Sequence, residues 1–223
     1  MRNLNPIPLA GLFVATIVLA VSSNLSHAQS PVDKSDGDRA KVAKLIEKGE
    51  TTEAAKLMQE LQPKAQDYNH APQVPFNVQF EEIKACGFYP QETRLECIIE
   101  IKRVNGYAGP IGSPGSIENV LFCVDWNNNG AFDQSEAVGI GSVAIHDESA
   151  NAQPGWQYAV YRDFDPRGGV RTSNTGNVTN TTTNGPSLKA RAILSWFVHP
   201  TSCNFVPVWG NGVNFRIRFD PTR

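Results

Sequence analysis

One twelve-residue stretch of this chain has the residue types and the spacing of a calcium-binding loop. Residues 125–136 read DWNNNGAFDQSE, which fits the pattern D-x-[DN]-x-[DN]-G-x5-E at every constrained position. Calcium takes six to eight oxygen ligands, which such a loop supplies from five side chains and one backbone carbonyl. Gly130 stands where the loop must turn sharply. The candidate ligands are Asp125, Asn127, Asn129, the backbone carbonyl of Ala131, Asp133 and Glu136.

Strands, and not helices, are predicted on both sides of this loop. An apolar run at 120–124 leads into it, and the segment 137–145 leads out. The pattern therefore predicts an EF-hand-type loop at the end of a β-hairpin. A metal-free turn is the alternative, because Asn129-Gly130 between apolar runs is a common hairpin signal. The acid six residues after Gly130 favours the metal, because a bare hairpin does not need it.

The number of carboxylates in the loop sets the expected affinity. Only Asp125, Asp133 and Glu136 are anionic, and the two Asn side chains contribute neutral oxygens. Such a site is expected to be weak, with a dissociation constant of roughly 10⁻⁴ to 10⁻³ M. The predicted cofactor is therefore a structural calcium ion, suited to a protein outside the cytoplasm.

The residues after 72 predict an all-β fold, an antiparallel β-sandwich of about seven strands. Leu95, Cys97, Ile99 and Ile101 alternate with polar residues, which is typical of a half-buried strand. Clusters of Gly, Pro and Asn separate the strands. No helix is predicted between them, which favours antiparallel pairing in two sheets. The predicted strands are 78–85, 94–102, 118–124, 137–145, 157–164, 188–198 and 214–219.

Two stretches between the predicted strands have the composition of loops. Residues 107–116 are rich in Gly and Pro, and residues 172–187 are rich in Thr, Asn and Gly. We expect both to lie on the surface, and the second to be mobile.

A short helical hairpin is predicted before the sandwich, within residues 29–71. This segment is rich in Lys, Glu, Ala and Leu. Apolar periodicity predicts one helix over 38–48 and a second from 51 or 52 to Pro63. Two short helices cannot bury their own apolar faces, so the hairpin is expected to dock on another surface or to act as a spacer. Partial disorder is the alternative.

The first 28 residues have the pattern of an export signal. Arg2 precedes an apolar run over 7–21, and Ser26-His27-Ala28 is a typical cleavage site. We place the cut after Ala28. A membrane anchor is the alternative, but the run is shorter than the ~20 residues that span a bilayer. The sequence therefore predicts a periplasmic or extracellular protein with no membrane span after cleavage.

Four cysteines follow the predicted signal, which in an exported chain indicates disulfides. No C-x-x-C spacing suggests zinc or redox chemistry. Cys86 and Cys97 lie on consecutive predicted strands at similar distances from the turn between them, so we expect them to pair. Cys123 would then pair with Cys203. Free buried thiols are the alternative.

The segment VLFCVDWNNNGAF at 120–132, with Glu136, resembles the strand-to-loop segment of GEVED-type domains. These are β-sandwich modules of secreted bacterial proteins. The likeness covers about a fifth of the β region. It departs at Asn129, where the family prefers Asp, and at Ser135, where it prefers Gly. The resemblance implies a secreted β-sandwich, and these departures imply weaker calcium binding. Other segments resemble exported bacterial proteins of unassigned function, which adds no activity.

No recognised catalytic spacing appears, so an enzyme is not predicted. His146-Asp147-Glu148 and Asp163-x-Asp165 end predicted strands, where charged residues normally face water. The formal net charge of −2 argues against nucleic acid as a partner. The sequence therefore predicts an exported, non-catalytic interaction or surface-structural protein, with a protein or glycan partner at the cell envelope. A carbohydrate-binding module is the alternative, with Trp126, Trp156 and Trp209 stacking on sugar rings. Hydrolase activity is less favoured.

Overall fold

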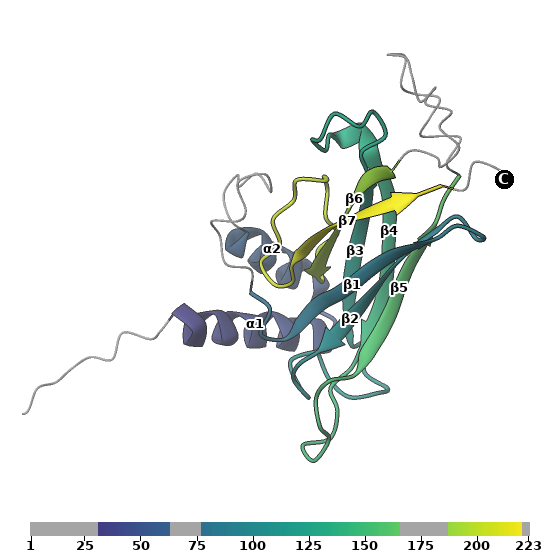
Figure 1. The fold of residues 1–223 in the computed structure, drawn as a ribbon. Helices are drawn as coiled ribbons and strands as arrows, with labels where there is room; N and C mark the ends of the chain where they lie inside the picture. The colour runs from purple at the N-terminus through teal and green to yellow at the C-terminus, as the bar shows by residue number, and fades with distance from the viewer. Residues whose placement is uncertain (1–30, 63–76, 166–186, 220–223) are drawn as a thin grey trace, which may run out of the picture.

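A computed structural model describes residues 31–62, 77–165 and 187–219 of the 223-residue chain. The described residues form two β-sheets with a pair of helices beside them (Figure 1). The all-β prediction is confirmed, and so is the number of seven strands. The predicted export signal lies outside the described residues, as does the 172–187 tract except for its last residue.

The predicted hairpin is present as helices α1 (Pro31–Glu47) and α2 (Thr51–Leu61). Gly49 ends the first helix with a φ of 77°, a left-handed conformation that glycine adopts without steric cost. Helix α1 begins seven residues before the predicted start at 38, with Pro31 in its first turn, where a missing N–H breaks no hydrogen bond. Neither helix is long and apolar enough to cross a membrane.

The smaller sheet contains strands β1 (Glu81–Tyr89), β2 (Arg94–Ile101) and β5 (Gln157–Asp163) in the order β1-β2-β5. All neighbours are antiparallel. The prediction placed the first strand at 78–85, several residues too early. Its partner explains the shift, because β1 pairs with β2 as far as Tyr89 opposite Arg94, and Gly87 is held within the ladder opposite Glu96.

The larger sheet contains β3 (Ser116–Val124), β4 (Ala137–Ile145), β6 (Ser187–Trp196) and β7 (Gly212–Arg218). The order is β4-β3-β6-β7, again antiparallel throughout. Strand β3 is central, and eight of its nine residues are buried. A central strand covered on both faces reads as a continuous apolar run, as 120–124 does.

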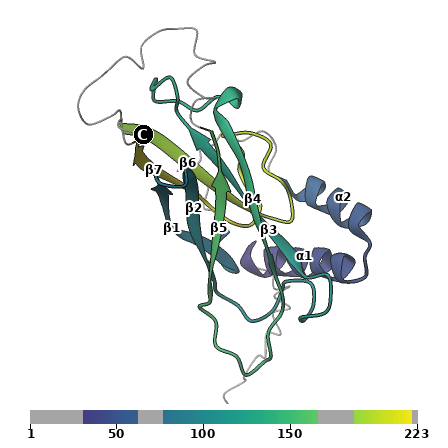
Figure 2. The ribbon, with the colours of Figure 1, turned by 90° about the vertical axis from the view of Figure 1, so that its right-hand side faces the viewer.

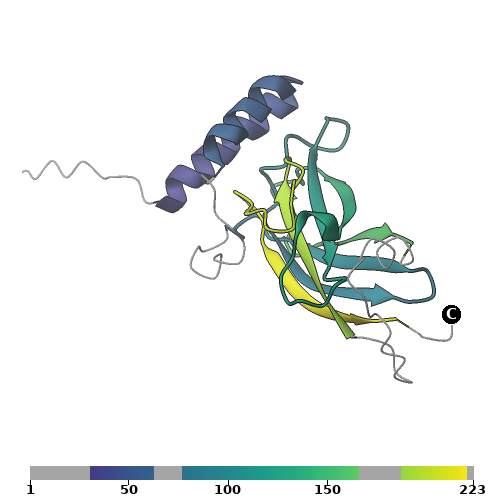
Figure 3. The same cartoon turned by 90° about the horizontal axis from the view of Figure 1, so that it is seen from above.

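The two sheets pack face to face, and β4 contacts β5 while β1 contacts β7 at the sheet margins (Figure 2). Side chains from both sheets form one core, which includes Leu95, Ile99, Phe122, Leu194 and Trp196. Seen from above, the two helices lie side by side next to this sandwich (Figure 3). Their buried residues belong to the same core, among them Val42, Ile46, Ala54 and Met58.

The loop prediction for 107–116 is wrong at its beginning. Tyr107 is fully buried and Ala108 is 2% exposed, whereas Ile111 is 80% exposed. The Tyr107 hydroxyl donates a hydrogen bond to the carbonyl of Phe80 at 2.7 Å. Asp147 accepts hydrogen bonds from the backbone N–H groups of Tyr107 and Gly109, which holds the start of the loop against the sandwich.

Both predicted disulfides are confirmed. Cys86 and Cys97 face each other across the β1–β2 ladder, and Cys123 at the end of β3 is joined to Cys203. No cysteine is free. Disulfides of this kind persist in oxidising compartments.

Candidate metal centre

The twelve-residue loop connects β3 to β4 at one end of the larger sheet (Figure 1). Its flanks are strands, as predicted: β3 ends at Val124, and β4 begins at Ala137. The first loop residue, Asp125, is fully buried, and its N–H donates to the Lys189 carbonyl at 3.0 Å. Pairing with β6 therefore continues into the loop and fixes the position of this carboxylate.

The first half of the loop folds around the Asp125 carboxylate. Its Oδ1 accepts a hydrogen bond from the Asn129 N–H at 3.0 Å, and its Oδ2 accepts one from the Gly130 N–H at 2.9 Å. Gly130 has a φ of 86° and Asn128 a φ of 52°, the left-handed conformations that Gly and Asn tolerate best. The chain therefore turns back over its own first residue, as the glycine position in the pattern requires.

The two Asn side chains extend the same arrangement. Asn127 Oδ1 accepts from the Asn129 N–H at 2.9 Å, and Asn129 Oδ1 accepts from the Ala131 N–H at 2.8 Å. These local side-chain to backbone bonds are the Asx turns that Asn and Asp favour. Each amide oxygen has a second lone pair beyond the one used here. The turn can therefore keep its bonds while these oxygens contact an ion.

The second half of the loop is closed by a short 3₁₀ turn, Gln134–Glu136. Asp133 and Glu136 form a capping box across this turn: Asp133 Oδ1 accepts from the Ser135 N–H at 3.0 Å, and Glu136 Oε2 accepts from the Asp133 N–H at 3.0 Å. Phe132 is 4% exposed and anchors the turn in a small apolar cluster with Cys123 and Cys203.

Glu136 keeps one oxygen free. The residue is only 2% exposed, and its Oε1 is buried with no hydrogen-bond partner. Burial raises the pKa of the Glu136 carboxyl, and the negative charges of Asp133 and Asp125 raise it further, whereas the N–H groups of Asp133 and Asn127 oppose the shift. A buried carboxylate oxygen without a partner carries a substantial free-energy cost.

Ion pairs within the described part of the chain do not balance the charge of the loop. None of the ion pairs among the described residues includes Asp125, Asp133 or Glu136. The Lys189 ammonium lies against the loop but donates to the Gly130 carbonyl, at 3.4 Å. The three carboxyl groups of the loop therefore have no ion-pair partner within the described residues.

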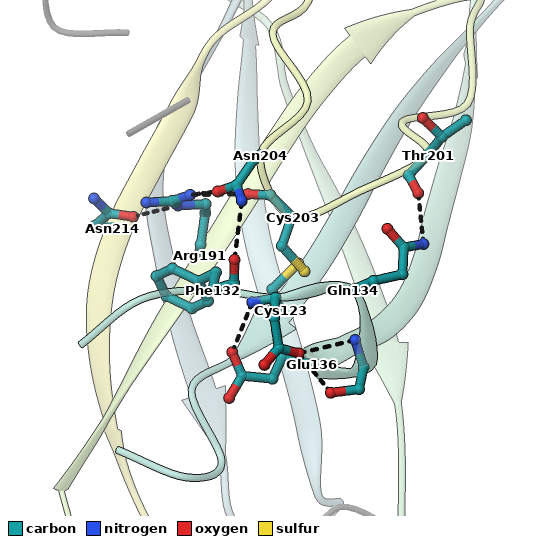
Figure 4. The surroundings of a disulfide bond; sticks show 11 residues. Cys123, Phe132, Gln134, Glu136, Arg191, Thr201, Cys203, Asn204 and Asn214 are labelled. Carbon is teal, nitrogen blue, oxygen red and sulfur yellow. Dashed lines mark hydrogen bonds between the residues drawn. A yellow bond between two sulfur atoms is a disulfide. The ribbon is translucent and has the colours of Figure 1, made fainter. Parts of the chain in front are cut away.

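A clamp formed by residues far along the chain holds the loop in place (Figure 4). The Cys123–Cys203 disulfide attaches the end of β3 to the segment after β6. Arg191 donates to the carbonyl of Cys203 and to Asn204 Oδ1, and Asn204 in turn donates to the Phe132 carbonyl at 2.9 Å. Gln134 donates to the Thr201 carbonyl at 2.9 Å. Arg191 and Asn204 were missed from the sequence, because no local pattern links them to a loop about sixty residues earlier.

The acidic side chains alone do not make a metal centre. Within the described ranges, no three His, Cys, Asp or Glu side chains are grouped as metal ligands. Calcium in this loop would also need the two Asn oxygens and the Ala131 carbonyl, as the sequence pattern implies. The donors are all hard oxygens, which fits calcium and not zinc or copper.

The three tryptophans proposed for sugar stacking do not share a surface. Trp209 is 1% exposed and packs edge-on against Trp196 at 5.4 Å. Trp126 is 8% exposed and packs against Phe164 and Phe219. Trp156 is half-buried and packs against the core. Trp126 and Trp209 therefore present almost no ring face to a sugar.

Two of the carboxylates considered for catalysis, those of Asp147 and Asp163, already have partners. Asp147 holds the 107–109 backbone, as described above, and Asp163 forms a two-point ion pair with Arg94. That pair lowers the pKa of the Asp163 carboxyl, which suits a charged partner for arginine and not a general acid.

Comparison with known proteins gives no match: no protein-family model, curated protein or solved structure is similar to this chain.

Proposed function

We propose that this chain is an exported β-sandwich of the interaction or surface-structural type, stabilised by one calcium ion in the 125–136 loop. One observation carries the calcium proposal. The first three pattern side chains, those of Asp125, Asn127 and Asn129, accept from the loop's own backbone N–H groups, and Glu136 Oε1 is buried without a hydrogen-bond partner. A divalent cation would satisfy that oxygen and balance the three carboxyl groups.

The chemistry of the donors defines the expected ion. Asp125, Asp133 and Glu136 supply charge, and Asn127, Asn129 and the Ala131 carbonyl supply neutral oxygens, the kind of mixture that calcium accepts in loops of this spacing. Three carboxylates predict a dissociation constant of roughly 10⁻⁴ to 10⁻³ M. An ion bound this weakly stays bound where calcium is millimolar, and it acts as a structural element and not as a sensor.

The disulfides support export. Two pairs in one chain require an oxidising compartment, and one of them, Cys123–Cys203, stands directly before the loop. Together with the export-signal pattern of residues 1–28, this supports a periplasmic or extracellular location.

The exposed surface supports interaction more than catalysis or sugar binding. Tyr89 and Tyr161 are about half exposed on the smaller sheet, at 49% and 50%. A shallow depression of about 280 Å³ on the β1–β2 face is lined mainly by Phe88, Tyr89, Ile98 and the Cys86 region, with Glu96 as its one carboxylate. One carboxylate is not an acid–base pair. The burial of Trp126 and Trp209 argues against sugar stacking.

Thermal unfolding with and without calcium tests the proposal. At 10 mM calcium, ten to a hundred times the expected dissociation constant, the melting temperature should rise by about 3–10 °C over that in chelator. Magnesium at the same concentration should produce a smaller shift, because it demands a tighter octahedral geometry.

Two variants separate ion binding from loop folding. Asp125→Ala removes a ligand and two backbone acceptors, so it should abolish the calcium shift and also lower the melting temperature in chelator. Glu136→Gln keeps an oxygen that can accept from the Asp133 N–H, so it should abolish or strongly reduce the shift with little change in chelator. An unchanged melting temperature of the wild-type chain at 10 mM calcium would remove the ion from the proposal.

A further inference from the structure

Helix α1 inserts one charged side chain into the sandwich. Arg39 is fully buried, although it lies on a helix that packs against the outside of the two sheets (Figure 3). Its Nη1 and Nη2 donate to the two carboxylate oxygens of Glu81, each at 2.7 Å, and its Nε donates to the Gly106 carbonyl at 3.3 Å. Two parallel bonds from a planar guanidinium to one carboxylate are the strongest arrangement for this pair of groups.

Aromatic rings surround the same guanidinium. Its central carbon lies 4.0 Å from the ring centre of Phe80 and 4.1 Å from that of Trp196. The rings of Tyr107 and Trp209 lie at 5.3 and 5.8 Å. A cation over aromatic faces is attracted by their negative charge density, most strongly where water is excluded. These residues come from the start of β1, the loop after β2, the end of β6 and the segment before β7.

A second carboxylate forms a longer ion pair with Arg39, without a hydrogen bond. Glu118 Oε1 lies 3.8 Å from Arg39 Nη2, too far for a hydrogen bond, and both Glu118 oxygens are buried without a partner. The indole N–H groups of Trp196 and Trp209 are also buried without partners. We call the surroundings of this guanidinium the cation chamber; its members are Phe80, Glu81, Tyr107, Glu118, Trp196 and Trp209.

The cation chamber contains polar groups that make no hydrogen bond to Arg39: the Glu118 carboxyl oxygens and the indole N–H groups of Trp196 and Trp209. Buried polar groups of native proteins are almost always hydrogen-bonded, so each unpaired one requires an explanation, such as strain, a functional role or a bound water or ion. Burial raises the pKa of Glu118 well above its usual value, and the Glu81 charge adds to this, whereas Arg39 opposes it. Burial also raises the pKa of Glu81, and the charge of Arg39 and its hydrogen bonds oppose that shift.

We propose that the sandwich carries a receptor for a guanidinium group, and that Arg39 of the N-terminal hairpin is its ligand within the same chain. The chamber belongs to the sandwich, whereas the hairpin supplies only the ligand. The hairpin is therefore docked as an arginine-bearing helix, and not held as a spacer. Two further polar contacts accompany Arg39: Asp36 pairs with Arg103 at 3.0 Å, and Gln62 donates to the Val206 carbonyl.

Chemical complementation of an emptied chamber tests this proposal. Arg39→Ala in the full chain removes the ligand and leaves the receptor. Methylguanidinium added at 0–20 mM should then raise the melting temperature saturably, by about 3–6 °C at ten times its dissociation constant. Sodium chloride and methylammonium at the same concentrations should not reproduce the rise, because neither presents the planar fork of donors.

Arg94→Ala is the matched control. Arg94 also forms a two-point pair with a carboxylate, at 2.7 and 3.2 Å to Asp163, and lies 4.0 Å from the Tyr161 ring centre. Its side chain is 26% exposed and that of Asp163 is 53% exposed. Methylguanidinium should not stabilise Arg94→Ala, because an open surface offers no enclosed site.

The outcomes decide between a receptor and an ordinary ion pair. A saturable rise in Arg39→Ala that is absent from wild type, and absent after the further change Glu81→Gln, supports the receptor. No rise in a folded Arg39→Ala, or an equal rise with methylammonium, overturns it. If Arg39→Ala does not fold, Arg39→Lys decides: a melting temperature clearly below wild type supports recognition of the guanidinium fork, and a wild-type value contradicts it.

Discussion

Strand β3 carries a buried carboxylate near each of its ends, and the two ends differ in how that charge is balanced. Near the start of β3, Glu118 faces the Arg39–Glu81 pair in the cation chamber. Just beyond its end, Asp125 is held by loop N–H groups beside Asp133 and Glu136, with no side-chain cation paired to them. Seven residues, roughly 23 Å of extended chain, separate the two carboxylates.

The difference shows at which end of β3 the chain itself supplies the cation that balances the buried charge. The chamber contains its own cation, supplied by the hairpin. The loop contains carboxyl groups, neutral oxygens and one buried oxygen without a hydrogen-bond partner. Under the calcium proposal, an ion from solution balances its charge. Changes to the chamber are therefore expected to act on folding at any calcium concentration, and changes to the loop mainly on the response to calcium.

Loss of the chamber cation is expected to have the largest effect. Arg39→Ala leaves Glu81 buried and unpaired, which typically costs about 3–5 kcal/mol. Urea unfolding with and without calcium measures this cost, which should be the same in both. Arg94→Ala, which removes a more exposed arginine, should have a free energy of unfolding close to that of wild type. Equal effects of the two variants would remove the distinction between the enclosed and the open arginine pair.

Removal of the disulfide beside the loop is expected to have the second-largest effect on stability. Cys123 and Cys203 are 80 residues apart, and Cys86 and Cys97 are 11 apart. Chain entropy therefore predicts a loss of about 4 kcal/mol for the first pair on replacement by Ser, and about 3 kcal/mol for the second. Only the first replacement should also weaken the calcium response, because that disulfide clamps the loop. Loss of the calcium response in both variants would contradict the clamp.

The pH dependence of stability is expected to reveal the raised pKa of Glu118. The folded pKa of Glu118 lies well above 4.5, its ordinary value, so the folded chain holds a proton that the unfolded chain releases. Stability should therefore fall as the pH rises above 4.5, by roughly 1 kcal/mol per pH unit, until the folded pKa is passed. Arg39, Glu81 and Tyr107 are the other titratable groups that face Glu118.

Glu118→Gln removes that proton and keeps the shape of the side chain. The free energy of unfolding, measured with denaturant at several pH values above 4.5, should depend less on pH in the variant than in wild type. The stability of the variant relative to wild type should therefore increase as the pH rises. Parallel profiles would mean that Glu118 does not take up the proton.

The two ends of β3 also differ in how far the sequence predicts them. The side-chain to backbone hydrogen bonds within the loop join residues at most five positions apart, so a twelve-residue pattern was enough to predict the turn. The Arg39–Glu81 pair joins residues 42 positions apart, and no local pattern marks it.

Strand pairing accounts for the remaining differences from prediction. Period-two alternation located β2 almost to the residue, because one face of that strand is regularly buried. It placed β1 too early, because Gly87 and Cys86 extend the strand only through their partners on β2. Tyr107 was predicted to lie on the surface because its neighbours are Gly and Pro, and its burial depends on distant partners, among them Phe80 and Asp147.

Direct titration with calcium tests the central proposal most directly. Isothermal calorimetry on the wild-type chain should give one ion per chain, with a dissociation constant of roughly 10⁻⁴ to 10⁻³ M. Glu136→Gln, which keeps a bond to the Asp133 N–H, should bind at least tenfold more weakly. Absence of binding at 10 mM calcium, or equal binding by wild type and Glu136→Gln, would contradict calcium in the 125–136 loop.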